Sequence, residues 1–124
     1  MTKTILIVED DPFIALDLQD TFENEGFEVF GPVAAVDEAL SLLERGIPDV
    51  AMLDYNLGRE TSIPLAHQLD KISVPYIFVS GQVDRVVTGN DQRQQTVVSK
   101  PFDPDRLIQI IKDLITKNDN PIFQ

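Results

Sequence analysis

The stretch TILIVEDD at residues 4–11 decides how the rest of the chain can fold. Its first five residues are β-branched or aliphatic without a break, which is too short for a helix and typical of a central parallel strand buried on both faces. The acids Glu9 and Asp10 follow where this strand would leave the core. Asp11 and Pro12 then provide a helix cap and a first-turn proline. We therefore predict a strand that leads directly into a helix, with two acids at the junction.

The same alternation of a short apolar strand and an amphipathic helix continues along the chain. Apolar residues recur at helical spacing from Ile14 to Phe22, until Gly26 stops the pattern. Further strands are predicted over 27–30, 50–53, 76–79 and 96–98, and further helices over 36–44, around 63–69 and from 104 onward. Five strands that alternate with helices favour a parallel sheet covered on both faces and joined by right-handed crossovers.

Four places should interrupt this regular pattern. The second strand should end at Gly31-Pro32, and the polar segment 56–61 should be a loop. Residues 82–95 combine β-branched residues and a glycine with five amide side chains, so we expect the fourth helical segment to be short or mobile. Residues 118–124 are expected to form a loose tail.

Composition limits the classes of function that fit. The 124 residues, 43% of them hydrophobic, suit one globular domain. Acids outnumber bases 21 to 10, and the net charge of -11 opposes binding to nucleic acid or to an anionic membrane. The absence of cysteine excludes a disulfide framework and fits a reducing compartment. No apolar run approaches the roughly 20 residues that span a bilayer, and no signal peptide is evident, so we expect a soluble cytoplasmic protein.

Chemically reactive side chains stand at the ends of the predicted strands. They are Glu9, Asp10, Asp54, Ser80 and Lys100, which follow or close four different apolar runs. In an open parallel sheet, ligands bind outside the carboxyl ends of the strands. We therefore expect three acids, a hydroxyl and an amine to meet in one crevice.

The three acids predict a magnesium site with a nucleophile in it. Clustered carboxylates repel one another unless a hard cation takes up their charge, and Mg²⁺ suits one or two carboxylates together with phosphate oxygens and waters. Glu9 and Asp10 would share the ion with Asp54, and the backbone carbonyl of Asn56 could add a further oxygen. The carboxylate of Asp54 could then attack phosphorus and form an aspartyl phosphate.

Lys100 and Ser80 complete this prediction. Phosphoryl transfer needs positioning and charge neutralisation, and a lysine ammonium opposite the metal supplies a second positive pole, while the Ser80 hydroxyl can donate to a phosphoryl oxygen. Taken singly, each would be ordinary: a solvated lysine, or a serine in a turn beside Gly81. Asp11 is interpreted as a helix cap rather than a ligand, and His67 as a solvated residue. A phosphoryl-transfer site forms only if all these groups meet.

Four motifs carry a resemblance to a known family. They are ILIVEDD at 5–11, AMLDYNLG at 51–58, IFVSG at 77–81 and SKPFD at 99–103. With these motifs the chain resembles the receiver domain of two-component response regulators over essentially its whole length. The resemblance implies a flavodoxin-like, doubly wound (βα)5 fold, an α/β fold whose five-stranded parallel sheet has the order 2-1-3-4-5.

The resemblance also implies a role for each site residue. By position, Asp54 corresponds to the phosphoacceptor, Glu9 and Asp10 to the acidic pair that binds Mg²⁺, Ser80 to the switch hydroxyl and Lys100 to the phosphate-binding lysine. In this family the peptide bond that follows the lysine is often cis, which would aim the amine inward.

A narrower similarity and one departure concern the switch. PYIFVSGQ at 75–82, followed by an unhelical segment, is similar to the FAT GUY group of receivers that lack an output domain. Val97 occupies the position where many receivers carry a switch aromatic, so any switch should work through Ser80 and the weak helical segment. Asn56 and Gln82 correspond to positions that influence autodephosphorylation in such domains.

We therefore expect a stand-alone response regulator, with a receiver domain over 1–118, a tail over 119–124 and no output domain. A histidine kinase or histidine phosphotransfer protein would phosphorylate Asp54. The phosphorylated chain would either contact an unknown downstream protein or serve as a phosphate sink. Apart from self-catalysed phosphorylation and dephosphorylation, no enzyme activity is expected.

Two other functions compete with this prediction. A haloacid dehalogenase-type phosphatase also uses a strand-end aspartate and Mg²⁺, but it places a second aspartate two residues later, where this chain has Asn56. A degenerate receiver could act as an adaptor that binds partners without phosphorylation. Steady hydrolysis of a phosphate ester would favour the first, and failure to gain a phosphoryl group would favour the second.

Overall fold

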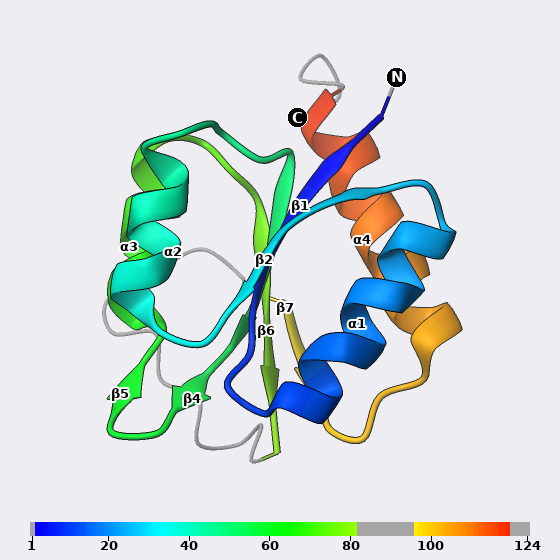
Figure 1. Cartoon of the computed structure of the whole chain (residues 1–124). Helices are drawn as coiled ribbons and strands as arrows, with labels where there is room; N and C mark the ends of the chain where they lie inside the picture. The colour runs from blue at the N-terminus through cyan, green and yellow to red at the C-terminus, as the bar shows by residue number, and fades with distance from the viewer. Residues whose placement is uncertain (1, 82–95, 120–124) are drawn as a thin grey trace.

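A computed structural model describes residues 2–81 and 96–119 of the chain. A central sheet separates two layers of helices: α1 (Pro12–Asn24) and α4 (Pro104–Asp119) cover one face, and α2 (Val36–Leu43) and α3 (Ile63–Lys71) cover the other (Figure 1). The backbone alternation predicted from the sequence therefore gives the expected three-layer arrangement. Within the described part of the chain, no helix is both long enough and apolar enough to cross a membrane.

The sheet has five parallel strands. Their bounds are β1 (Thr4–Val8), β2 (Glu28–Val33), β3 (Val50–Asp54), β6 (Tyr76–Ser80) and β7 (Thr96–Ser99). The spatial order is β2-β1-β3-β6-β7, which is the predicted order 2-1-3-4-5 counted over these five strands. The flavodoxin-like doubly wound fold is thereby confirmed. The order changes direction at β1 and β3, the point at which such sheets open a crevice for ligands.

Side chains of alternate residues build two separate cores. On β1, Leu6 and Val8 belong to the core beneath α2 and α3, whereas Ile5 and Ile7 belong to the core beneath α1 and α4. Each of these four residues is buried, as a strand covered on both faces requires. Packing on both sides thus explains the continuous apolar run at residues 4–8.

The first helix begins and ends as predicted. The Asp11 side chain accepts hydrogen bonds from the backbone N–H groups of Phe13 and Ile14, at 2.9 and 3.3 Å, and Pro12 occupies the first helical turn. Gly26 follows the helix with a φ of +91°, a left-handed conformation that favours glycine. The interpretation of Asp11 as a helix cap is confirmed, and His67 on α3 is exposed as expected.

The prediction that Gly31-Pro32 closes the second strand is wrong. β2 continues through both residues to Val33, with Gly31 at a φ of +97° and a cis peptide bond between Gly31 and Pro32. The pairing register with β1 shifts between Leu6 and Val8, which absorbs the irregular residues. The strand tolerates the proline because it lies at the edge of the sheet and pairs with β1 alone. The N–H that Pro32 lacks is therefore not needed by a second neighbouring strand.

The prediction of a loop over 56–61 is also wrong. The segment forms a small antiparallel ribbon of two strands, β4 (Asn56–Leu57) and β5 (Glu60–Thr61). Leu57 is buried in the core beneath α2 and α3, and Gly58 adopts a φ of +73° in the turn. The burial of Leu57 helps to hold the polar segment in place, which the sequence pattern did not indicate.

The last helix is slightly longer than predicted. The backbone of α4 runs to Asp119, whereas the tail was expected to begin at residue 118. The expectations for the helical segment 82–95, for Gln82 and for residues 120–124 lie outside the described residues.

Candidate functional site

Four strands deliver polar side chains to one edge of the sheet. Glu9 and Asp10 follow β1, Asp54 is the last residue of β3, Ser80 is the last residue of β6, and Lys100 follows β7. Because all four strands are parallel, their carboxyl ends lie at the same edge. The structure thus places all five predicted site residues at this edge.

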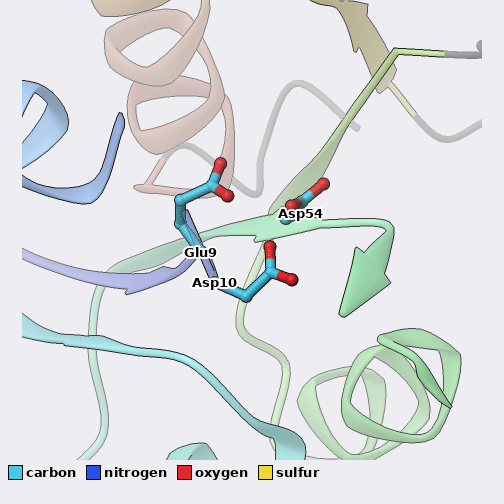
Figure 2. Close-up of side chains that lie close together, drawn as sticks. All are labelled: Glu9, Asp10 and Asp54. Carbon is cyan, nitrogen blue, oxygen red and sulfur yellow. The ribbon is translucent and has the colours of Figure 1, made fainter. Parts of the chain in front are cut away.

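The three carboxylates form a cluster that could hold a cation. One ligand oxygen from each of Glu9, Asp10 and Asp54 lies within 4.8 Å of the others, and Figure 2 shows the three side chains gathered where β1 and β3 end. Glu9 and Asp54 are buried, while Asp10 is exposed and opens the cluster to solvent. A set of carboxylate oxygens with one open side fits Mg²⁺, which keeps some of its waters when it binds.

Lys100 lies against two of these acids. Its Nζ is 2.9 Å from Oε1 of Glu9 and 3.3 Å from Oδ2 of Asp54. The backbone N–H of Lys100 also donates to the carbonyl of Ser80, and the Lys100-Pro101 peptide is cis, as the resemblance implied. The amine of Lys100 therefore reaches the acidic cluster from the end of β7, the edge strand, which is separated from β3 by β6.

The second oxygen of Glu9 is occupied as well. Oε2 of Glu9 accepts a hydrogen bond from the backbone N–H of Asp11 at 3.0 Å. Glu9 is thus held between the start of α1 and the ammonium of Lys100. In this arrangement, Glu9 fixes Lys100 beside Asp54, and Asp10 and Asp54 offer the more accessible oxygens to a cation.

The environment of Asp54 makes its charge costly. Burial, together with the hydrogen bond and negative charge of Glu9, raises the pKa of Asp54 from 3.8 to about 7, and Lys100 only partly offsets this rise. Burial alone would lower the pKa of Lys100, but Glu9 and Asp54 outweigh that effect and raise it. The amine of Lys100 is therefore charged at neutral pH. The Asp54 carboxyl, whose pKa is raised, would be more fully ionised near neutral pH if a cation were bound beside it.

The remaining predicted residues occupy less central positions. Ser80 is buried and lies one residue beyond Val79, the residue that pairs with Asp54 across β3 and β6. Asn56 is exposed at the start of the ribbon. Val97 on β7, at the position where many receivers carry a switch aromatic, is half-buried and packs against the core beneath α2 and α3. The roles assigned to these residues stay predictions.

A groove beside Lys100 did not emerge from the sequence analysis. It has a volume of about 570 Å³ and lies between α1 and the segment that joins β7 to α4. Its lining combines apolar residues such as Ile14 and Phe102 with the acids Asp17 and Asp20. The helical periodicity of α1 could have indicated which side chains face α4, but it could not show that a groove remains open there.

Comparison with known proteins assigns the family. The model of the response regulator receiver domain matches residues 5–112, and the chain belongs to this family. Among curated relatives, PhyR of Methylorubrum extorquens is 28% identical over 121 residues, covering 93% of this chain and 44% of the relative. TorR of Escherichia coli O157:H7 is 32% identical over 123 residues, covering 96% of this chain and 53% of the relative. The chain thus spans about half the length of these relatives.

Solved structures agree with this assignment. PhyR from Brucella abortus superimposes with a TM-score of 0.85 at 29% identity, covering 98% of this chain and 51% of that one. A CheY-like receiver domain protein from Methanospirillum hungatei gives a TM-score of 0.81 at 25% identity, covering 98% and 99% of the two chains. The fold and family are therefore those of a response regulator receiver domain.

Proposed function

We propose that this receiver domain accepts a phosphoryl group on Asp54 in a reaction that depends on Mg²⁺. The observation that carries the proposal is the position of Asp54 between the acids Glu9 and Asp10 and the amine of Lys100, with Nζ of Lys100 at 3.3 Å from its carboxylate. A nucleophile, a place for a cation and a second positive charge are the parts that phosphoryl transfer requires.

The reaction would proceed by attack of an Asp54 oxygen on phosphorus. With a phosphohistidine donor, the new P–O bond forms as the P–N bond breaks, and the electron pair of that bond returns to the imidazole. The oxygens of Glu9, Asp10 and Asp54, together with the carbonyl of Asn56, would hold Mg²⁺. The ion would supply positive charge that favours the ionised Asp54 and offsets charge on the phosphoryl oxygens.

Lys100 and Ser80 would bind the transferred group. The ammonium of Lys100 already lies within 3.3 Å of the nucleophile, so a phosphoryl oxygen on Asp54 could replace the carboxylate contact without a large movement. The Ser80 hydroxyl would donate to another phosphoryl oxygen. Since Asn56 stands where the haloacid dehalogenase enzymes place a second acid, we propose no turnover of phosphate esters.

A histidine kinase or histidine phosphotransfer protein would serve as the donor. The groove beside Lys100 adjoins the site, and its mixed apolar and acidic lining suits a protein surface with apolar and basic side chains. Phe13 and Leu16, which are also on α1, are 80% and 59% exposed and offer further apolar area to such a partner. A reaction of this kind would take place in the cytoplasm, where such donors act.

The phosphorylated chain would either contact a downstream protein or serve as a phosphate sink that removes phosphoryl groups from the donor. One structural relative is described as the anti-anti-sigma factor PhyR from Bartonella quintana, which is 26% identical to this chain with a TM-score of 0.84. That description concerns a protein about twice as long, since the match covers 50% of it. By analogy, we propose that the phosphorylated chain changes its affinity for a downstream protein.

Incubation with acetyl phosphate in the presence and absence of Mg²⁺ tests the proposal. We expect a mass gain of one phosphoryl group only with Mg²⁺. No gain under either condition would contradict the proposal and favour an adaptor that works without phosphorylation. If the mass gain is observed, phosphotransfer assays with the kinases of the source organism would identify the donor.

A further inference from the structure

The ribbon that follows Asp54 is fastened to a helix from another part of the chain. Oε2 of Glu60 on β5 accepts a hydrogen bond from the backbone N–H of Val36 at 3.2 Å, across 24 positions of sequence. Val36 is the first residue of α2, and the N-cap residue Ala35 has no polar side chain with which to cap the helix. Glu60 therefore provides the cap that Ala35 lacks.

The carboxylate of Glu38 satisfies a different group at the same helix end. It accepts from the N–H of Ala34 at 3.2 Å, and both residues belong to the α2 region. This second contact stabilises the start of α2 but does not touch the ribbon. Glu38 therefore makes a local contact at this helix end, whereas Glu60 makes a long-range one.

The ribbon is too short to keep its place by itself. Each of its strands has two residues, Asn56 pairs with Thr61, and Leu57 pairs with Glu60. Isolated two-stranded ribbons are marginally stable in water, so external contacts must hold this one. Leu57 is buried in the core, and the N–H of Ser62 donates to the carbonyl of Tyr55 at the base of the ribbon. The hydrogen bond from Val36 to Glu60 adds a link between β5 and α2.

We propose that Glu60 is a positioning residue for the cation site. By tying the ribbon to α2, it would hold Asn56, two residues after Asp54, so that the Asn56 carbonyl can serve as a ligand. The inference rests on the proposed function, in which Asn56 contributes a backbone oxygen to Mg²⁺. The Glu60 side chain is exposed, and its negative charge at the N-terminus of α2 favours the contact because the helix dipole is positive there.

Calorimetric titration of Mg²⁺ into the full chain tests the inference. Glu60→Ala should weaken Mg²⁺ affinity by about threefold to tenfold, below the about 10- to 100-fold typical of partners that touch a ligand directly. Glu60→Gln keeps an acceptor oxygen and should recover most of the affinity. Glu38→Ala removes an acid at the same helix end that does not contact the ribbon, and it should leave the affinity unchanged. Equal affinities for Glu60→Ala and wild type would overturn the inference.

A second variant separates positioning from the stability of α2. Ala35→Ser in the Glu60→Ala background gives α2 a cap of its own without restoring the link to the ribbon. We expect it to recover thermal stability but not Mg²⁺ affinity. If it recovers both, Glu60 acts only by stabilising α2 and the inference is wrong.

Amide hydrogen exchange without Mg²⁺ provides an independent measurement. Exchange at Ser62, whose N–H donates to the carbonyl of Tyr55 at the base of the ribbon at 3.0 Å, should be faster in Glu60→Ala than in wild type or in Glu38→Ala, because the ribbon opens more often. Unchanged exchange together with unchanged affinity would overturn this inference alone. A wild-type chain that binds no Mg²⁺ would overturn the proposed function and the inference with it.

Discussion

The ammonium of Lys100 lies 2.9 Å from the carboxylate of Glu9, although the two residues are 91 positions apart in the chain. An ion pair of equal length joins Lys112 to Glu25, which follows the C-terminal end of α1, whereas the site lies at its N-terminal end. The two pairs differ in environment: the Glu9 side chain is 2% exposed, whereas that of Glu25 is 37% exposed. Although the two distances are equal, the pair of Lys100 and Glu9 should contribute more to stability, because water screens the exposed pair of Lys112 and Glu25.

Lys100→Met should lower the free energy of unfolding by about 1–3 kcal/mol at neutral pH, because it leaves Glu9 and Asp54 without their positive partner. Lys112→Met is the matched control and should cost about 0–1 kcal/mol. Urea denaturation of both variants measures the difference. Added Mg²⁺ should reduce the loss in Lys100→Met, since the ion replaces part of the missing charge. A loss in Lys112→Met as large as that in Lys100→Met would contradict this explanation.

Asp54→Asn should abolish labelling by acetyl phosphate, because an amide cannot act as the nucleophile. Intact-protein mass spectrometry with Mg²⁺ present measures the label. Asp113→Asn, an exposed residue of α4, is a control that should label at the wild-type rate. Full labelling of Asp54→Asn would show that another residue is the acceptor.

Asp54 should make the metal-free protein less stable as pH rises from about 4 to about 7. Its pKa is 3.8 in ordinary surroundings and about 7 in the folded chain, so over this window the folded state keeps a proton that the unfolded state has lost. Stability should therefore fall with rising pH through this window and level off above it. Asp54→Asn should remove this contribution while other groups keep theirs.

Urea unfolding at about pH 5 and about pH 8, with a chelator present, measures the difference between the two proteins. Because Mg²⁺ competes with the proton on Asp54, stabilisation by added Mg²⁺ should be greater at the higher pH. The same pH dependence in wild type and Asp54→Asn would show that the pKa of this carboxyl is not raised.

Gly31→Ala should destabilise the edge strand more than Gly26→Ala destabilises the end of α1. Both glycines have a left-handed φ, at +97° and +91°. A Cβ at Gly31 would lie 2.8 Å from the nitrogen of Val33 and 2.9 Å from the carbonyl oxygen of Ile7, whereas Gly26 faces open space. We expect losses of about 2–4 kcal/mol for Gly31→Ala and about 1–2 kcal/mol for Gly26→Ala. Denaturant midpoints measure both, and equal losses would mean that the contacts at Gly31 relax.

Much of this architecture was predictable because the physics involved is local. The apolar runs at β1, β3 and β6 had to be buried on both faces, and strands that alternate with helices had to be parallel. Parallel strands share a carboxyl edge, so Asp54 and Lys100 could be placed together from their positions alone. The order of the strands came from family resemblance, since alternation permits other orders.

The errors arose where a tertiary contact outweighed a local preference. Gly31-Pro32 is a strong turn signal, but an edge strand can absorb it with a shift of register. The polar segment after Asp54 became a ribbon because Leu57 is buried and Glu60 bonds to α2. A window of neighbouring residues shows neither that Val36 bonds to Glu60 nor that Leu57 is buried.

The sequence by itself determined which chemical groups this protein carries and at which strand ends they emerge, since both depend on side-chain identity and on short-range periodicity. Only the tertiary structure decided that Lys100 pairs with Glu9 and that the pKa of Asp54 rises to about 7. Electrostatic energy depends on the distance between charges and on how far water is excluded from them. Both quantities are fixed when distant segments pack together, so they are properties of the folded chain.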